Sequence, residues 1–186
     1  MSSLARFSLP QYELMVATGV FAGKFHQRVE LIRGEIRQMN PIGPDHAAVV
    51  NFLARWTFEN TDARKIVCSV QNPIRLPASD SSPEPDIAWL VQKRYPQHPL
   101  PGDVLLLVEI ADRTLQLDLG EKAALYAESK IREYWVVDIE GRRLVVHRQP
   151  AGGRYRDTRE FAGQEAVAPH FSPGARLAVS QVFSVL

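Results

Sequence analysis

The sequence predicts an α/β protein of the α+β kind, in which helices pack on a mixed β-sheet. Runs that are apolar on both alternating faces predict strands covered on both sides, and segments with helical spacing lie between such runs. Antiparallel pieces are expected near both ends of the chain. Together these patterns indicate a sheet with helices packed against it.

The N-terminal part is expected to hold a short helix and a hairpin. Residues 11–16 are predicted to be helical, with Ser8 or Pro10 near the start of the helix. Residues 28–32 and 35–39 are predicted as two strands joined by an Arg-Gly turn.

The next segment combines an amphipathic helix with a strand. Apolar residues recur at helical spacing across residues 45–60, and Asp45 is placed to cap that helix. Residues 66–70 and 73–76 predict one strand or a bent pair, followed by a polar loop at residues 78–83.

Two apolar strands and a second helix follow. The strands are expected at residues 85–90 and 104–110, with a proline-rich excursion at residues 95–102 between them. The second helix lies within residues 114–129 and is expected to begin near Asp118.

The last predicted elements are strands. A buried strand is expected at residues 133–138, followed by a Glu-Gly turn into residues 143–148, and residues 155–161 complete an antiparallel edge. A chain of 186 residues with 45% hydrophobic content can bury one real core, so residues 1–186 are predicted to form a single domain.

Composition limits the classes of function. The formal charge of +1 neither demands nor excludes a nucleic-acid partner. Because Cys68 is the only cysteine, an intrachain disulfide and a cysteine-based zinc site are excluded. Residues 1–8 lack an apolar signal core, and the apolar runs fall short of the roughly 20 residues of a membrane helix, which predicts a cytoplasmic location. A serine-hydrolase elbow and a glycine-rich phosphate loop are also missing.

The charges are distributed unevenly. Acids outnumber bases between residues 80 and 121, whereas arginines crowd residues 142–159. This layout suits a cation-binding centre flanked by a rim that attracts phosphate. Arginines that keep an exposed hairpin soluble explain the second cluster equally well.

Asp86 and Glu109 are the most informative residues of the chain. Each stands at the end of an apolar run, where an ionised side chain is costly unless it is paired or bound to a cation. We interpret the two carboxylates as metal ligands on neighbouring strands.

Lys122 follows the apolar stripe of the second helix. The lysine either extends outward past its neighbours, pairing with Asp118, or points its ammonium group at the sheet. Because the preceding strand ends in Glu109, the second orientation is favoured. Two carboxylates, a cation and a lysine suit phosphodiester hydrolysis: Mg²⁺ prefers hard oxygen ligands, and a lysine stabilises developing charge on the phosphoryl oxygens.

The order and spacing of these blocks resemble those of a known family. Residues 85–88, 108–114 and 131–138, with Lys122 and Tyr126 between them, are similar to the Uma-two family of restriction endonucleases, within the PD-(D/E)XK nuclease superfamily. The resemblance extends backward through residues 30–36, Met39, Pro41 and His46, and covers most of the chain from about Tyr12 to Arg148.

The resemblance implies a restriction-endonuclease-like fold: a central mixed β-sheet flanked by helices, with antiparallel N- and C-terminal hairpins. It implies Asp86 and Glu109 as ligands of Mg²⁺, for which Mn²⁺ substitutes, and we add the Ile110 carbonyl as a third ligand. In the superfamily a lysine usually stands two positions after the second acid, where this chain has Ala111. The family's pattern takes its lysine from the following helix, which Lys122 matches.

Glu30 matches an acidic position in the first segment of the family. It resembles the additional N-terminal acid of many such nucleases, which holds a second metal or a metal-bound water. Alternatively, Glu30 is an exposed strand carboxylate paired with Arg28 or Arg37.

Other residues have two interpretations each. Asp118 is a site residue or, as we favour, the first residue of a capping box. His46 is a general base or, as we favour, a hydrogen-bonding group near a helix N-terminus. Gln71 reaches the site only if its strand lies beside it. Tyr134 and Trp135 are expected in the core rather than stacked on bases.

The sequence therefore predicts a magnesium-dependent endonuclease acting on DNA. Cutting two strands takes two sites, which predicts a homodimer, and the edge at residues 143–161 is a candidate for pairing between copies. Selective reading of DNA would come from loops such as residues 95–102 or from a partner. The alternative is a nuclease-like module that binds nucleic acid or protein without cleaving, as Ala111 and the modest net charge suggest.

Overall fold

The structure is a computed structural model that describes residues 4–22 and 28–186, so residues 1–3 of the N-terminal stretch considered above lie outside it. Its described residues form a six-stranded sheet in the order β3-β4-β5-β6-β7-β8. The strands are β3 (Ile66–Val70), β4 (Ile87–Val91), β5 (Val104–Ala111), β6 (Glu133–Asp138), β7 (Arg143–Ala151) and β8 (Arg154–Ala162). Strands β5 and β6 are parallel, and the other neighbouring pairs are antiparallel. The predicted mixed sheet is confirmed.

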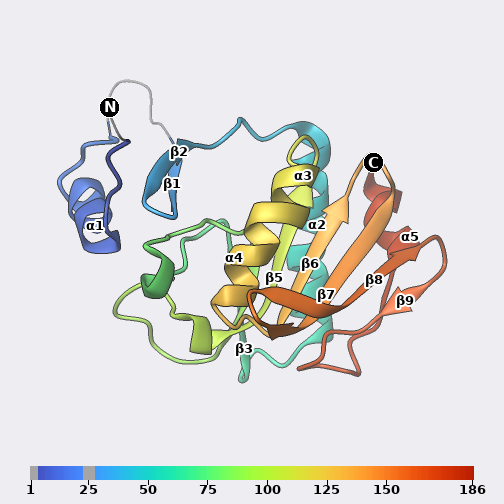
Figure 1. Ribbon diagram of the computed structural model, residues 1–186. Coiled ribbons are helices and arrows are strands. Elements are labelled where there is room, and N and C mark those ends of the chain that lie inside the picture. Colours follow the sequence, from blue (N-terminus) through green and yellow to red (C-terminus); the bar gives the residue numbers. More distant parts are fainter. Residues whose placement is uncertain (1–3, 23–27) are drawn as a thin grey trace.

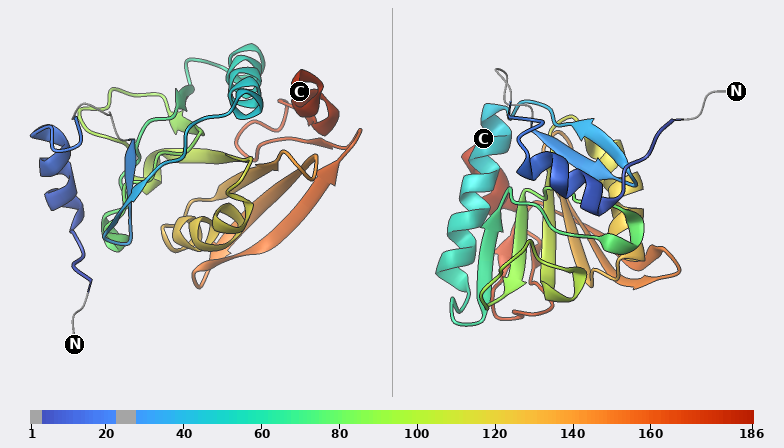
Figure 2. Two further views of the ribbon diagram at one scale, coloured as in Figure 1. Left: turned by 90° about the horizontal axis from the view of Figure 1, so that it is seen from above. Right: turned by 90° about the vertical axis from the view of Figure 1, so that its left-hand side faces the viewer.

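A helical connection explains why β5 and β6 are parallel. The chain leaves β5 and passes through α3 (Leu115–Leu117), a π-helical turn η3 (Asp118–Lys122) and α4 (Ala123–Glu128) before it enters β6. A parallel pair needs a crossover of this kind. The crossover covers one face of the sheet, and α2 (Pro44–Asn60) lies on the opposite face beside α5 (Val179–Val182) (Figures 1 and 2).

Strand β5 divides its side chains between the two layers. Leu106, Val108 and Ile110 pack in the core under α2, whereas Leu107 and Ala111 pack in the core under α4. Because successive side chains of a strand alternate between faces, Glu109 points into the layer that holds α4 and η3. The Glu109 carboxylate therefore meets the helix that carries the lysine.

The aromatic residues of β6 belong to the core, as predicted. Tyr134 and Trp135 are fully buried on opposite faces of the sheet. On the face under α2, the ring of Trp89 stacks on Trp56 with centroids 5.9 Å apart, and the Trp89 indole N–H donates to the Thr57 hydroxyl at 3.0 Å. These contacts fix α2 on β4.

The N-terminal elements form a separate layer beside the sheet. Helix α1 (Leu9–Ala17) begins at Ser8, which forms a capping box with Gln11. Strands β1 (Val29–Ile32) and β2 (Glu35–Gln38) form the predicted hairpin. Both turn residues have positive φ, 52° at Arg33 and 78° at Gly34, as a two-residue turn of type I′ requires. A bridge from Leu31 to Ser82 holds the hairpin beside the chain entering β4.

Two local predictions were wrong. Residues 73–76 do not form a strand: the Ile74 N–H donates to the Pro83 carbonyl, and Leu76 makes an isolated bridge to Ser81. The cap of α2 is Gly43 rather than Asp45, because Pro44, whose fixed φ suits a first helical position, starts the helix.

The chain ends in elements that the sequence patterns did not predict. Short strands β9 (Ala166–Val167) and β10 (Leu177–Ala178) pair antiparallel, and α5 leads into the 3₁₀ turn η4 (Phe183–Val185). Further 3₁₀ turns are η1 (Pro77–Ser79) and η2 (Pro101–Asp103). Among the residues described, no helix has the length and apolar character needed to cross a bilayer.

Candidate active site

A cavity of about 410 Å³ opens where β4 begins, β5 ends and α2 starts. Because β4 and β5 are antiparallel, with Ile87 opposite Val108, the start of one strand lies beside the end of the other. Carboxylates dominate the charged side chains of its wall. The acidic lining residues are Glu30, Glu84, Asp86, Glu109, Asp112 and Asp118, and the basic ones are Arg28, Arg113 and Lys122. This excess of negative charge attracts cations.

Asp86 is held from three sides. Its Oδ2 accepts the Ile110 N–H at 2.9 Å and lies 3.0 Å from His46 Nε2, and its Oδ1 accepts from the Gln71 side-chain amide at 3.2 Å. Burial alone would raise the pKa of Asp86, but the contacts with His46, Ile110 and Gln71 outweigh burial and lower it. Asp86 is therefore ionised at neutral pH.

Gln71 and His46 are brought to Asp86 by their own backbones. Gln71 adopts φ 51°, a left-handed conformation that is unfavourable for a non-glycine residue, and its N–H donates to the Asp86 carbonyl at 3.1 Å. His46 lies in the first turn of α2, as expected, and its buried Nδ1 has no hydrogen-bond partner within the described chain. Both residues orient the Asp86 carboxylate.

Glu109 is the centre of a second buried cluster. Its Oε1 accepts from Lys122 Nζ at 3.1 Å and from the Tyr126 hydroxyl at 2.7 Å. Lys122 Nζ also lies 3.5 Å from Glu30 Oε2, and the lysine is only 5% exposed. The lysine thus points at the sheet, and the outward orientation considered from the sequence is wrong.

The charges in this cluster are not fully balanced. Burial raises the pKa of Glu109 to about 8; neighbouring carboxylates, Asp118 first, also raise it, while Lys122 lowers it. Burial works against the charged form of Lys122, but Glu109, Glu30 and Asp118 outweigh burial and raise the lysine's pKa. Lys122 therefore stays protonated, and an additional cation would favour ionised Glu109.

Glu30 does not behave as an exposed strand carboxylate. The residue is 6% exposed, and its Oε2 lies near Lys122 and accepts the Glu84 N–H at 3.4 Å. The two arginines considered as partners bind elsewhere, Arg28 to Glu84 and Arg37 to other glutamates. The structure brings Glu30 into the site, where its carboxylate faces the lysine.

The capping role favoured for Asp118 is wrong. The helical segment begins at Leu115, and Asp118 lies inside it, in the π-helical turn, where its carboxylate accepts from the Thr114 hydroxyl at 2.5 Å. A π turn disturbs the regular hydrogen-bond ladder, and such turns are frequent at functional sites. Here the Asp118 carbonyl accepts from the Tyr134 hydroxyl at 3.1 Å. The turn places Asp118 and Lys122 in the cavity wall together.

The donors in the cavity fit a hard divalent cation. Asp86 and Glu109 offer carboxylate oxygens in one cavity, and Mg²⁺ is held by one or two carboxylates while it keeps several waters. Among the described residues, no group of three or more His, Cys, Asp or Glu side chains is arranged to hold a metal ion. Ile110 lines the cavity, and its N–H is engaged by Asp86.

Sequence reasoning missed two contributors to the site. Tyr126 is among the residues that resemble the family, but no role in the site was predicted for it, and its hydroxyl binds Glu109. Glu84 forms an ion pair with Arg28 at 3.0 Å on the cavity wall. The helical spacing of four residues between Lys122 and Tyr126 is the signal for the first, since both lie on one helix face. We find no local signal for the second.

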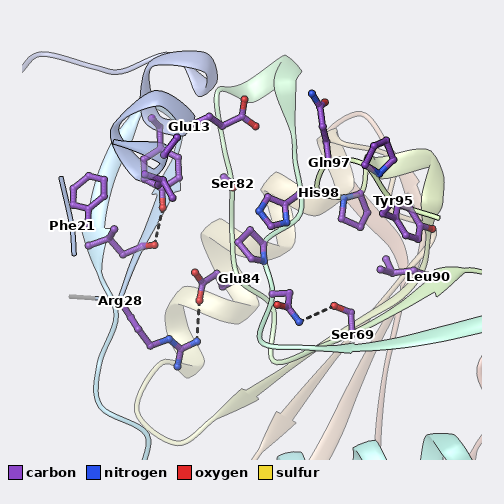
Figure 3. Close-up of a pocket in the computed structure, with 18 of the residues that line it drawn as sticks. Glu13, Phe21, Arg28, Ser69, Ser82, Glu84, Leu90, Tyr95, Gln97 and His98 are labelled. Atoms are coloured by element: carbon purple, nitrogen blue, oxygen red, sulfur yellow. Dashed lines mark hydrogen bonds and ion pairs between the residues drawn. The ribbon is translucent and has the colours of Figure 1, made fainter. Parts of the chain in front are cut away.

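A larger cavity of about 970 Å³ adjoins the first one, and Arg28 and Glu84 line both. Figure 3 shows their ion pair at one side of this cavity and Tyr95, Gln97 and His98 at the other. Phe21 also lines the cavity. Aromatic rings and side-chain amides thus lie next to the acidic site.

Comparisons with known proteins show the fold and the family of this chain. A solved structure described as "a putative nuclease belonging to DUF820 from Anabaena variabilis" superposes with a TM-score of 0.77 at 17% identity, covering 96% of this chain and 98% of that chain. The structural likeness confirms the nuclease-like fold. No curated protein shows significant similarity to the chain. The model of the Uma2 (Uma-two) family, described as "Putative restriction endonuclease", matches residues 24–180. Since that match spans most of the sequence, the chain belongs to the Uma2 family.

Proposed function

We propose that this protein is a magnesium-dependent endonuclease that hydrolyses DNA phosphodiester bonds. The observation that carries the proposal is the buried contact between Lys122 and Glu109, in the same cavity as the firmly held Asp86. An acid pair can hold a cation, and an adjacent ammonium group can stabilise the charge that develops during phosphodiester attack. Membership of the Uma2 family supports the same reaction class.

Asp86 and Glu109 would hold the ion, with Mn²⁺ as a substitute and the Ile110 carbonyl as a proposed third ligand. When bound, the cation supplies Lewis-acid stabilisation of the phosphoryl oxygens and lowers the pKa of a water molecule. The chain keeps both carboxylates in place: His46, Gln71 and the Ile110 N–H orient Asp86. Partners of this kind preserve ligand geometry in metal sites.

Lys122 and its neighbours perform the remaining tasks. The lysine would donate to a phosphate oxygen and stabilise the charge that develops there, which is the role Ala111 leaves open in β5. Tyr126 fixes Glu109 through the 2.7 Å hydrogen bond. Glu30, whose carboxylate lies 3.5 Å from the ammonium group, would keep that group directed into the cavity and would accept a hydrogen bond from a water molecule.

Purified protein should nick or cut plasmid DNA with Mg²⁺ or Mn²⁺, and a chelator should stop the reaction. Asp86→Asn and Glu109→Gln should each lower the cleavage rate by about 100-fold or more, because even outer partners of metal ligands contribute roughly 10–100-fold. Glu59→Gln, which changes an exposed acid on α2, should leave the rate unchanged.

The same protein also tests the alternative of a non-cleaving binding module. Calorimetry with Mg²⁺ should give a binding signal that is lost in Asp86→Asn. If wild type retains DNA but cleaves none of its forms with either metal, the nuclease proposal fails and the binding module replaces it.

We further propose that nucleotides flanking the cut phosphate enter the larger cavity shown in Figure 3. Arg28 and Glu84 line both cavities, so a strand that leaves the catalytic site can continue into this space. Tyr95 offers an aromatic face, and Gln97 and Asn72 offer amides that recognise base edges. The proline-rich loop predicted to read DNA supplies one wall.

Tyr95→Ala should raise KM for a short DNA substrate by about 5- to 150-fold, since stacking of one base contributes roughly 1–3 kcal/mol. The value of kcat should change little, because Tyr95 lies outside the catalytic cavity. Tyr95→Phe, which keeps the ring and loses the hydroxyl bond to the Val91 carbonyl, should retain the wild-type KM. An unchanged KM in Tyr95→Ala, with cleavage intact, would contradict this placement of the substrate and leave the catalytic proposal standing.

A further inference from the structure

Strand β8 forms one edge of the central sheet. It pairs with β7 on one side, and no strand of the described chain pairs with its other side. Figure 2 shows β8 at the margin of the sheet. An edge strand presents a row of N–H and C=O groups that a further strand can bind.

The backbone contacts of Ala162 show which residues of β8 present these groups outward. Its N–H donates to the Glu165 side chain at 2.9 Å, and its carbonyl accepts the Glu165 N–H at 3.1 Å. Ala162 therefore exchanges no hydrogen bonds with Arg143, its partner on β7. Because hydrogen-bonded and non-hydrogen-bonded pairs alternate along an antiparallel ladder, the N–H and C=O groups of Thr158 also point away from β7.

We propose that β8 pairs antiparallel with β8 of a second copy of this chain, about a two-fold axis at Thr158. In this register each Thr158 N–H meets the Thr158 carbonyl of the other copy. Arg156 then lies opposite Glu160, and Asp157 lies opposite Arg159. Each of these charged residues thus faces a residue of opposite charge when two copies of the strand run antiparallel. Opposite charges across a pair stabilise a sheet.

Charge also selects this register over its neighbours. Moving the axis to Asp157 would place Asp157 opposite Asp157, and moving it to Arg159 would place Arg159 opposite Arg159. Like charges directly opposite one another are unfavourable. The axis at Thr158 avoids both repulsions and forms every charged pair twice, as two-fold symmetry requires.

The charged side chains lie at the surface, and both acids already have an arginine partner within one copy. Arg156, Arg159 and Glu160 are exposed. Asp157 lies 2.9 Å from Arg159 and Glu160 lies 2.8 Å from Arg143, so the dimer would bring a second arginine to each acid. Charged edges also occur as protection against unwanted pairing, which is the competing explanation for this composition. Protection of the edge does not require that opposite charges be placed symmetrically about Thr158. The proposed dimer does not depend on nuclease activity, although it would join two catalytic sites in one particle.

Sedimentation analysis across a range of protein concentrations tests the pairing through Thr158. Wild type should sediment with twice the monomer mass at micromolar concentration. Thr158→Pro removes an outward N–H, a change that edge strands tolerate, and should yield monomers. Thr158→Val keeps the N–H while losing the hydroxyl contact with His147, and should remain dimeric. Circular dichroism checks that each variant is folded.

A charge exchange tests the register without changing backbone hydrogen bonding. Asp157→Arg and Arg159→Asp should each weaken the dimer at least tenfold, and the double variant should restore it, because the pairs within and between copies then re-form. Arg55→Asp, on the distant exposed face of α2, should have no effect. A wild type that stays monomeric, or a dimer indifferent to both Thr158→Pro and the single charge reversals, would overturn the proposal whatever the nuclease assay shows.

Discussion

Replacing Lys122 with methionine should abolish DNA cleavage and lower the free energy of unfolding by about 3–5 kcal/mol, the usual cost of breaking a buried ion pair. The ammonium group lies 3.1 Å from Glu109 and 3.5 Å from Glu30, and all three side chains are buried. Its removal leaves Glu30 without this cationic partner and Glu109 without the ammonium group that favours its ionised form. Urea denaturation at neutral pH, together with the plasmid assay, measures both effects.

The stability loss in Lys122→Met should grow as pH rises above about 8. The pKa of Glu109 in the folded protein, about 8 with the lysine present, exceeds its ordinary 4.5, so in the wild type the stability contributed by this group is lost between about pH 4.5 and 8. Without Lys122, which lowers the pKa of Glu109, the variant goes on losing stability above pH 8. The double variant with Glu109→Gln should recover stability without recovering cleavage. If Lys122→Met is as stable as wild type, the lysine does not hold the two acids.

Replacing Trp89 with alanine should lower the free energy of unfolding by about 3–5 kcal/mol, because removing a buried aromatic ring leaves a cavity. Trp89 is 1% exposed, stacks on Trp56 and donates to Thr57, so it joins β4 to α2. Loss of that contact should also disturb His46 at the start of α2 and slow cleavage. Urea titration followed by fluorescence of the remaining tryptophans measures the stability change.

A matched control for this prediction lies on the same helix. Phe58 is 67% exposed, and Phe58→Ala should change stability by less than about 0.5 kcal/mol, as is usual for surface substitutions. A loss of equal size in both variants would show that the core between α2 and the sheet is not the main support of this layer.

The sheet was largely predictable because its strands are marked by apolar runs. Residues 104–110 and 133–138 could be recognised as covered strands, whereas their parallel pairing was found only in the structure. Residues 73–76 were misjudged because Ile74 and Leu76 are buried in an irregular segment, and burial alone does not distinguish a strand from a packed loop. The C-terminal strands β9 and β10 have two residues each, too short for periodicity to be seen.

The site was predictable to the extent that its residues break an apolar pattern. Asp86, Glu109 and Lys122 stand out in that way, and the structure gathers them in one cavity. Their metal-binding and catalytic roles remain predictions. Asp118 was misjudged because no residue preference marks a π turn in a sequence. An aspartate followed three residues later by a glutamate was therefore interpreted as a helix cap. The hydrogen bond from Tyr126 to Glu109 forms because the helix packs on the face of β5 that bears Glu109, and the sequence does not show which face the helix covers.

The position of Lys122 has a consequence for how this protein could be controlled. In a nuclease that carries acid and lysine on one strand, the two groups cannot separate without unfolding the sheet. Here Ala111 occupies the strand position, and the ammonium group belongs to the crossover between β5 and β6. A small shift of that crossover would withdraw the ammonium group while leaving Asp86 and Glu109 in place, so the charge proposed to assist cleavage would be disengaged by motion of one element.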